Sequence, residues 1–415
     1  MTDPIRVLHF ADTHIGMENY GKTDPTSGLS SRVVDFLHRM DDICNYAKEQ
    51  DADLIVFAGD AFKTRAPSPT FQREFAYRIR DLAEIAPVVL LIGNHDLPLT
   101  QMKASSVEIF ATLDVHNVRV ASEYETFVIN TKRGDVLVGT APYPLRARIL
   151  ENTKTNGLTI AETDARLQEQ LVHILEEMAE QADAQGDMPR LLTGHFTVGG
   201  ALVGSERSIM LGRDVSVPRD SLADSRWDYV ALGHIHKHQN LTAGREDVPA
   251  IVYSGSIERI DFGEEGDPKG FCWVELARDA TTWDFIRLEK VRPFVTLRAD
   301  LRDDEQPTRT VLQLIEKHNL DNAVVRFILQ FSQTSETRFN ENAIRDALKR
   351  SGAFHIAGIR KEVEQPARAR LGGSPEGMTP DQLLERYLQS QEIPPERRNE
   401  LLEVAESIFD QLKDT

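Results

Sequence analysis

Apolar residues recur along the first 260 positions in two alternating patterns. Three short apolar runs have the length and β-branched content of buried strands, at residues 5–10, 54–58 and 88–92. Between them, apolar residues recur at helical spacing over 33–47 and again over 69–85, and Ser68 is a suitable N-cap for the second helix. This part of the chain therefore predicts strands that alternate with helices.

The same alternation continues to about residue 260. Helices are expected over 103–113 and 162–181. Further strands are expected near Val118 and Phe127 and at residues 136–139, 190–193, 229–232 and 251–253. Strands and helices in this order predict a layered α/β core.

The pattern changes near residue 291. Residues 294–365 mix short strands with two helices, 310–318 and 340–351, which indicates a small α+β domain. Pro, Gly and Arg are frequent over 365–380, as in a linker, and two amphipathic helices follow. We therefore expect four parts, at residues 1–290, 291–365, 366–379 and 380–415.

Composition narrows the class of protein. Of the 415 residues, 40% are hydrophobic and 27% are charged, which is typical of a globular protein. No apolar run approaches the roughly 20 residues of a membrane helix, and no secretory signal is visible. The cysteines, Cys44 and Cys272, are too few for a disulfide framework. We expect a cytoplasmic protein without a membrane partner.

Candidate chemistry lies in five polar clusters, each directly after a predicted strand. The clusters are Asp12-Thr13-His14, Gly59-Asp60, Gly93-Asn94-His95-Asp96, Gly194-His195 and Gly233-His234-Ile235-His236. The carboxyl ends of strands in α/β sheets are where ligands bind, so these side chains are expected to converge. Glycine before a ligand lets two backbones approach closely.

Carboxylate, amide and imidazole groups together suggest a two-metal site. Two divalent ions need a bridging ligand, and a carboxylate can give one oxygen to each ion. The donor set suits Mn²⁺, with Mg²⁺, Zn²⁺ or Fe²⁺ as alternative occupants. Bound metal would also hold a phosphate substrate, which a net charge of 48 − 66 = −18 otherwise repels.

An Asp-x-His cluster alone is more often a turn or a cap than a ligand, because both residues favour turns. Gly-His-x-His alone is a weaker signal, whereas Gly-Asn-His-Asp is a fairly specific tetrapeptide. All five clusters in this order favour the metal site. The other histidines, among them His9, His38 and His173, lack this context and are interpreted as structural or surface residues.

The five clusters resemble the calcineurin-like metallophosphoesterase superfamily. Three further stretches resemble its bacterial SbcD-type exonuclease subunits, which act in double-strand-break repair. These are Ala66-Pro67-Ser68-Pro69, Tyr253-Ser254-Gly255-Ser256-Ile257-Glu258-Arg259, and Phe262-Gly263-Glu264-Glu265 leading to Pro268-Lys269-Gly270-Phe271. The resemblance is strong over residues 5–300. It implies a two-sheet β-sandwich core flanked by helices, a small α+β capping domain and a C-terminal helix pair.

The resemblance also implies a role for each site residue. One metal ion would be held by Asp12, His14 and His236. The other ion would be held by Asn94, His195 and His234. Asp60 would bridge the two ions. His95 would stabilise charge on the scissile phosphate and protonate the leaving 3′ oxygen, and Asp96 would orient His95.

The implied function is a Mn²⁺-dependent DNA exonuclease and endonuclease. Such a protein would process double-strand ends and hairpins in DNA replication, recombination and repair, as a homodimer with an SbcC-type coiled-coil ATPase. One alternative is a phosphomonoesterase or protein phosphatase; these enzymes commonly carry Arg where this chain has Ile92. Another is a metal-dead scaffold that binds the ATPase, although every expected ligand is present.

Contacts to DNA are weakly indicated. Lys63 follows the second cluster, where relatives often carry His or Asp, and both phosphate binding and a solvated position remain open. Arg360 and Lys361, in an Arg-rich stretch that extends to Arg368 and Arg370, are slightly better candidates. A solvated face is preferred for Arg146, Arg148, Arg207, Arg213, Lys349 and Arg350.

Two apolar helical faces are candidate interfaces. Helices over 68–85 and 103–113 would pair into the homodimer; the alternative is that both faces pack on the protein's own sheet. The helices over 380–412 would dock the ATPase rather than DNA, because residues 381–415 carry a net charge of 4 − 9 = −5. The alternative is that these two helices fold back and cover the small domain.

Overall fold

The computed structural model describes residues 3–98, 103–151, 158–204, 215–278, 280–364, 379–390 and 393–413. The chain forms two compact units. The first comprises Met1–Thr296, Leu320–Arg326 and Leu348–Ala357, and the second comprises Leu297–Asn319, Phe327–Ala347 and Gly358–Thr415. The four domain boundaries expected from the sequence remain predictions. Most of the expected linker, with Arg368 and Arg370, and also Arg207 and Arg213 lie outside the described residues.

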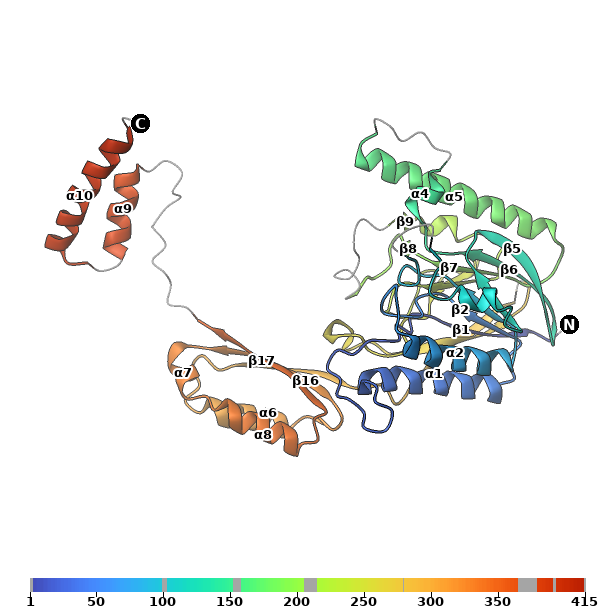
Figure 1. Cartoon of the computed structure of the whole chain (residues 1–415), viewed down its shortest axis with the longest axis horizontal. Coiled ribbons are helices and arrows are strands. Elements are labelled where there is room, and N and C mark those ends of the chain that lie inside the picture. Colours follow the sequence, from blue (N-terminus) through green and yellow to red (C-terminus); the bar gives the residue numbers. More distant parts are fainter. Residues whose placement is uncertain are drawn as a thin grey trace. The chain divides into compact units, whose positions relative to one another are not determined.

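The first unit contains a six-stranded sheet of mixed direction (Figure 1). Its order is β14 (Thr282–Arg287), β13 (Gly270–Leu276), β1 (Ile5–Phe10), β2 (Leu54–Phe57), β3 (Val88–Leu91) and β4 (Val118–Ala121). Strands β1 to β4 are parallel, and β13 pairs antiparallel with β1 and β14. The four parallel strands therefore deliver their carboxyl ends to one edge.

A second six-stranded sheet packs against the first. Its order is β11 (Gln239–Asn240), β12 (Ala250–Tyr253), β10 (Tyr229–Gly233), β7 (Arg190–His195), β6 (Gly134–Ala141) and β5 (Glu125–Thr131). Strands β12, β10, β7 and β6 are parallel, and β11 and β5 are antiparallel at the edges. A short parallel pair, β8 (Thr197–Val198) and β9 (Ser216–Val217), lies beside it.

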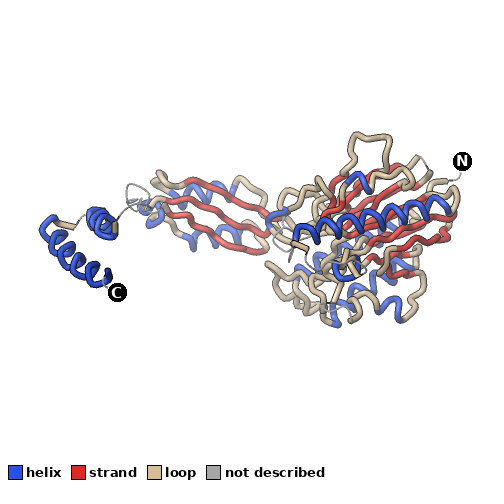
Figure 2. The backbone as a smooth tube through the Cα atoms, turned by 90° about the horizontal axis from the view of Figure 1, so that it is seen from above, coloured by secondary structure: helices blue, strands red, loops and turns tan. Residues whose placement is uncertain are grey.

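Helices cover the outer face of each sheet, which gives four layers (Figures 1 and 2). Helices α1 (Ser31–Glu49), α2 (Pro69–Ala83) and α3 (Ile109–Thr112) share a core with the first sheet. Helix α5 (Ile160–Ala184), which follows the short α4 (Arg146–Ile149), covers the second sheet. The apolar core between the sheets includes Val7, Val56, Leu191 and Ala231. The expected two-sheet sandwich flanked by helices is confirmed.

The chain then forms a small three-stranded sheet and two terminal helices. The sheet order is β15 (Phe294–Asp300), β16 (Val324–Phe331) and β17 (His355–Val363), and its helices are α6 (Pro307–Glu316), α7 (Gln333–Thr337) and α8 (Glu341–Arg350). Helices α9 (Pro380–Ser390) and α10 (Pro395–Lys413) contact each other. No helix within the described part of the chain is long and apolar enough to span a membrane.

The helix expected over 103–113 is much shorter than predicted. Only Ile109–Thr112 is helical. The preceding residues are held by the loop after β3, because Ser106 donates its N–H to the carbonyl of Asp96 at 3.0 Å. A backbone tied to that loop cannot also make the i→i−4 bonds of a helix, so the expectation was wrong over 103–108.

Candidate metal centre

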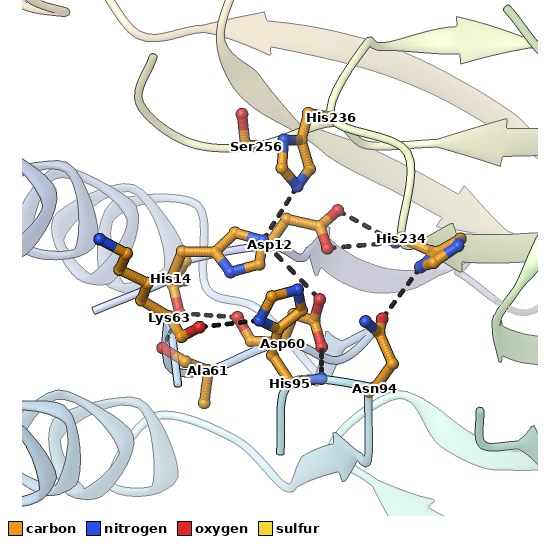
Figure 3. A network of polar contacts seen from close by, with 12 residues as sticks. Asp12, His14, Asp60, Ala61, Lys63, Asn94, His95, His234, His236 and Ser256 are labelled. Atoms are coloured by element: carbon orange, nitrogen blue, oxygen red, sulfur yellow. Dashed lines mark hydrogen bonds and ion pairs between the residues drawn. The ribbon is translucent and has the colours of Figure 1, made fainter. Parts of the chain in front are cut away.

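The expected site residues come together at one edge of both sheets (Figure 3). Asp12 and His14 follow β1, Asp60 follows β2, and Asn94 and His95 follow β3. His195 is the last residue of β7, which continues past its expected end because Gly233 pairs with His195, and His234 and His236 follow β10. The carboxyl ends of parallel strands from two sheets thus build one site.

The first group of expected ligands is Asp12, His14 and His236, whose ligand atoms lie within 4.8 Å of one another. The Nε2 atoms of His14 and His236 are 2.9 Å apart. Two imidazole nitrogens that face each other at this distance are arranged as neighbouring ligands of a cation, which binds neutral imidazole. Both Asp12 oxygens accept from the His234 N–H at 3.1 Å, which joins this group to the second.

The second group centres on the side-chain oxygen of Asn94. This oxygen is 3.1 Å from Nε2 of His195 and 3.0 Å from Nδ1 of His234. Asp60 lies between the two groups, with Oδ1 3.4 Å from Nε2 of His195 and Oδ2 3.7 Å from Nε2 of His14. A carboxylate in this position is able to bridge two ions.

The carboxylates of this site are removed from water. Asp12 is 0% and Asp60 2% exposed. Burial raises the pKa of Asp12. Burial also acts to raise the pKa of Asp60, but His195 and His95 outweigh it and hold that pKa well below its usual range. Buried carboxylates among imidazoles fit a bound cation, because a metal supplies the compensating charge.

Burial lowers the pKa of His14 well below its usual value, so this imidazole is neutral and able to bind a metal. At His195 burial also acts to lower the pKa, but the nearby Asp60 carboxylate outweighs it and raises the pKa to about 9. His195 would therefore have to release this proton in order to bind a metal beside Asp60.

Four expected ligands have left-handed backbone conformations. The φ angles are 53° at Asp12, 39° at His14, 62° at Asp60 and 94° at His234. Such residues cost of order 1–3 kcal/mol each and cluster where function requires a particular side-chain direction. The turns after β1, β2 and β10 thus direct these four side chains into the site (Figure 3).

Two glycines allow these turns to approach each other. A Cβ atom on Gly93 would lie 2.2 Å from Oδ1 of Asp60, and one on Gly59 would lie 2.3 Å from Nδ1 of His195. Both distances are shorter than any real contact, so the expected need for glycine is confirmed at these positions.

His95 is held by backbone rather than by Asp96. Its Nδ1 lies 2.8 Å from the carbonyl oxygen of Lys63, and its own N–H donates to Oδ1 of Asp60 at 2.8 Å. The expectation that Asp96 orients His95 was wrong. The buried Asp96 carboxylate instead accepts from the N–H groups of Asp60, Ala61 and Gly93, each at 3.0 Å. Asp96 therefore fixes the turns that carry the other residues.

A cavity of about 300 Å³ opens beside the site. The side chains around it include Lys63 and His95, and sequence reasoning missed four others: Met17, Asn19, Ile260 and Asp261. Nothing in the spacing of these four residues distinguished them. Sequence reasoning also missed the contact between Glu264 and His236. Glu264 nevertheless lies in one of the stretches that carried the family resemblance.

Four other side chains considered for DNA binding form ion pairs with residues of the same chain. Arg360 pairs with Glu362 at 3.1 Å, and Lys361 lies 3.6 Å from Glu341. Of the residues interpreted as a solvated face, Arg146 pairs with Asp164 and Arg148 with Glu123. These contacts do not favour phosphate binding by Arg146 or Arg148.

In comparisons with known proteins, the part of the chain that carries the site matches one protein family. A family model of calcineurin-like phosphoesterases matches residues 5–238, which include every expected metal ligand. The chain is 28% identical over 304 residues to the SbcD subunit of the nuclease SbcCD from Bacillus subtilis, covering 71% of this chain and 72% of that protein. Identity to the SbcD subunit of Escherichia coli K12 is 28% over 306 residues, covering 72% of each. A solved dimetal phosphatase from Danio rerio aligns with a TM-score of 0.39 at 10% identity, covering 68% of this chain and 99% of that one.

Proposed function

The chain belongs to the calcineurin-like phosphoesterase family, and from this we propose that it is a Mn²⁺-dependent DNA nuclease subunit. It would act as exonuclease and endonuclease on double-strand ends and hairpins, in replication, recombination and repair. One observation carries the proposal: carboxylate, amide and imidazole donors from both sheets converge around Asp60, beside a cavity that His95 lines. The similarity to the SbcD subunits of SbcCD nucleases supports DNA as the substrate.

The donor set fits two divalent ions. Asp12, His14 and His236 would hold one ion. Asn94, His195 and His234 would hold the other. Asp60 would contact both ions, in accord with its position between the two groups. When bound, the pair supplies positive charge that neutralises a phosphate and lowers the pKa of water.

His95 is suited to donate a proton. The Lys63 carbonyl accepts from Nδ1–H, and no described residue hydrogen-bonds Nε2, which leaves that nitrogen for a substrate in the cavity. A doubly protonated His95 would give its Nε2 proton to the leaving 3′ oxygen and would keep the Nδ1–H bond. The backbone carbonyl thus orients the ring in both protonation states.

The walls of the cavity favour a diester over a terminal phosphate. Ile92 stands in the position where phosphatases commonly carry Arg; it is buried in the core of the first sheet and gives the cavity no clamp for a terminal phosphate. Among the described lining residues, Lys63 is the one cationic side chain other than histidine, and Met17 and Ile260 are apolar. Apolar walls suit a sugar or base rather than the charged end of a monoester.

The apolar surface available for the proposed homodimer is smaller than the sequence predicted. Phe75, Ile79 and Leu82 of α2 are buried against the first sheet, so that face is not an interface. Within the described residues of the two segments expected at the interface, 68–85 and 103–113, the large apolar side chains that remain exposed are Tyr77 (47%), Ile109 (49%) and Leu113 (68%). These residues support a contact between copies.

Light scattering tests the dimer at micromolar concentration. Leu113→Glu should convert it to a monomer, because a buried unpaired charge is costly at an interface. Leu202→Glu is the matched control, since Leu202 is 62% exposed elsewhere in the same unit. A wild-type protein that is monomeric contradicts this part of the proposal.

A nuclease assay tests the function itself. Labelled duplex ends and hairpins are incubated with Mn²⁺, with and without an SbcC-type ATPase, and 4-nitrophenyl phosphate is offered in parallel. Cleavage of DNA that requires His95 supports the proposal. Hydrolysis of the monoester without DNA cleavage favours a phosphatase instead.

A further inference from the structure

A buried ion pair lies directly behind one expected metal ligand. One oxygen of Glu264, in the short η3 helix (Phe262–Glu264), is 2.8 Å from Nδ1 of His236, and the other is 2.8 Å from Nζ of Lys269. Glu264 and Lys269 are each 1% exposed. Burying two charges is costly even when they are paired, so this pair calls for a role beyond stability.

Glu264 determines which nitrogen of His236 carries the hydrogen. An ionised carboxylate only accepts hydrogen bonds, so Nδ1 must be the donor. The lone pair then lies on Nε2, the atom that faces Nε2 of His14 at 2.9 Å (Figure 3). Metal-binding histidines usually donate their second N–H in this way, which orients the ring toward the ion.

Lys269 holds the Glu264 carboxylate in place. Its Nζ donates to Oγ of Ser256 at 2.7 Å and to the carbonyl of His236 at 3.1 Å. The N–H of Ile260 donates to Glu264 at 2.9 Å.

Two other site histidines, His195 and His95, are supported by backbone carbonyls instead. Nδ1 of His195 lies 2.7 Å from the carbonyl of Ala58, and Nδ1 of His95 lies 2.8 Å from that of Lys63. A carboxylate makes a stronger, charge-assisted hydrogen bond than a neutral carbonyl and leaves more electron density on Nε2. Glu264 therefore supports His236 more strongly than a backbone carbonyl would.

We propose that Glu264, held by Lys269, is a positioning residue that fixes the Nδ1–H tautomer of His236 and so strengthens metal binding by the group of Asp12, His14 and His236. This inference rests on the proposed two-metal function. It also assigns a role to residues 253–259 and 262–271, the stretches that contain Ser256, Glu264 and Lys269.

Calorimetric titration of the metal-free full chain with Mn²⁺ tests the inference. Glu264→Gln should weaken one of the two binding events about 10–100-fold and leave the other unchanged. Glu265→Gln is the matched control, because Glu265 bears the same charge in the same segment but bonds to Thr296. Two unchanged binding events in Glu264→Gln, or equal weakening of both, would overturn the inference.

A second variant separates positioning from folding. Glu264→Gln leaves Lys269 buried without its carboxylate, which destabilises the fold, so the double variant Glu264→Gln with Lys269→Met removes both charges. Circular dichroism should show a native fold for this variant, and calorimetry should show the same loss at one site. If the double variant binds both ions as tightly as the wild type, Glu264 is not a positioning residue.

Activity provides a further readout. Nuclease activity of Glu264→Gln should fall at low Mn²⁺ and recover when Mn²⁺ is raised about 10–100-fold, since the weakened site refills. Failure to recover would overturn the inference. A wild-type protein that binds two Mn²⁺ ions but cuts no DNA contradicts the proposed function and leaves this inference standing. A wild-type protein that binds no Mn²⁺ overturns both.

Discussion

The metal centre and the C-terminal helix pair depart from the usual pattern of burial in opposite directions. At the centre, the carboxylates of Asp12 and Asp60 are withdrawn from water. On α9 and α10, Tyr387 is 52% and Val404 60% exposed. Buried charge requires a compensating charge, and exposed apolar side chains gain from a covering surface. Each departure thus indicates the kind of partner that the region binds.

The two regions also differ in how their geometry is maintained. Around Asp60, backbone N–H groups, a carbonyl and neighbouring side chains fix each position, and four residues hold strained φ angles. The described helix pair is an amphipathic unit whose helices contact each other. We propose that it docks the ATPase by helix-in-groove recognition, which depends on an apolar stripe more than on exact polar geometry. Substitutions should therefore separate the two functions.

Loss of Asp60 should have the largest effect. Asp60→Ala should remove both metal ions, because the Asp60 carboxylate lies between His14 of one group and His195 of the other. Loss of the metals should lower the cleavage rate by at least about 10³-fold, because the metals are expected to contribute several kcal/mol of charge stabilisation. Calorimetry with Mn²⁺ measures the first effect and the nuclease assay the second. Binding of the ATPase should be unchanged; retention of two ions would show that Asp60 is not the bridge.

Loss of His95 should separate chemistry from metal binding. His95→Ala should keep both ions but lower the cleavage rate by about 10²–10⁴-fold, because the proton donor is missing. His173→Ala, an exposed histidine paired with Glu177, is the control and should cleave normally. A variant that loses an ion in calorimetry would instead make His95 a ligand.

Changes in the helix pair should weaken binding of the ATPase and leave nuclease activity intact. Removal of residues 374–415 should leave a folded, Mn²⁺-dependent nuclease that no longer co-purifies with the ATPase. In the full chain, Tyr387→Glu should weaken partner binding by about 2 kcal/mol, or roughly 30-fold, as for an aromatic interface residue. Glu385→Gln, a change at an exposed polar position of α9, is the control. An unfolded truncated protein, or one that binds the ATPase at full strength, would contradict the docking role.

His9 should show the smallest effect, because this buried polar group already has partners within the chain. Its Nδ1 lies 3.2 Å from the Tyr229 hydroxyl and its Nε2 3.2 Å from the Leu232 carbonyl. Burial lowers the pKa of His9 from 6.5 to about 3. The unfolded chain therefore binds a proton that the folded chain excludes. Stability from His9 is present above about pH 6.5 and is lost as the pH falls toward 3, at roughly 1.4 kcal/mol per pH unit.

Urea unfolding of the metal-free protein measures this effect. Between pH 7 and pH 5, the wild type should lose about 2 kcal/mol more unfolding free energy than His9→Gln, which does not titrate. Equal losses in the two proteins would show that His9 is protonated in the fold.

Most of the fold was predictable because its elements are local. Apolar runs and helical spacing identified α1, α2, α5 and the parallel strands, since each pattern follows from which face of an element is buried. The edge strands β14 and β17 were not predicted. Both are only partly buried, so neither gives a clear apolar signal.

The sequence by itself determined which side chains form the candidate site. Asp12, Asp60 and His234 each follow a strand, and strand ends in this kind of sheet share an edge, so convergence did not depend on distant details. Helical spacing likewise identified the apolar face of α2. It did not determine that Phe75 packs on the protein's own sheet, because the pattern is the same for any apolar cover.

Only the tertiary structure decided how the site residues are held. The acceptor for His95 is the backbone carbonyl of Lys63, and every residue has such a carbonyl, so no side-chain pattern could reveal it. The family resemblance assigned Asp96 to His95, but the Asp96 carboxylate reaches the backbone of another turn. Glu264 meets His236 across 28 positions of chain. Such contacts depend on where the folded loops bring their atoms, and residue order alone does not specify that.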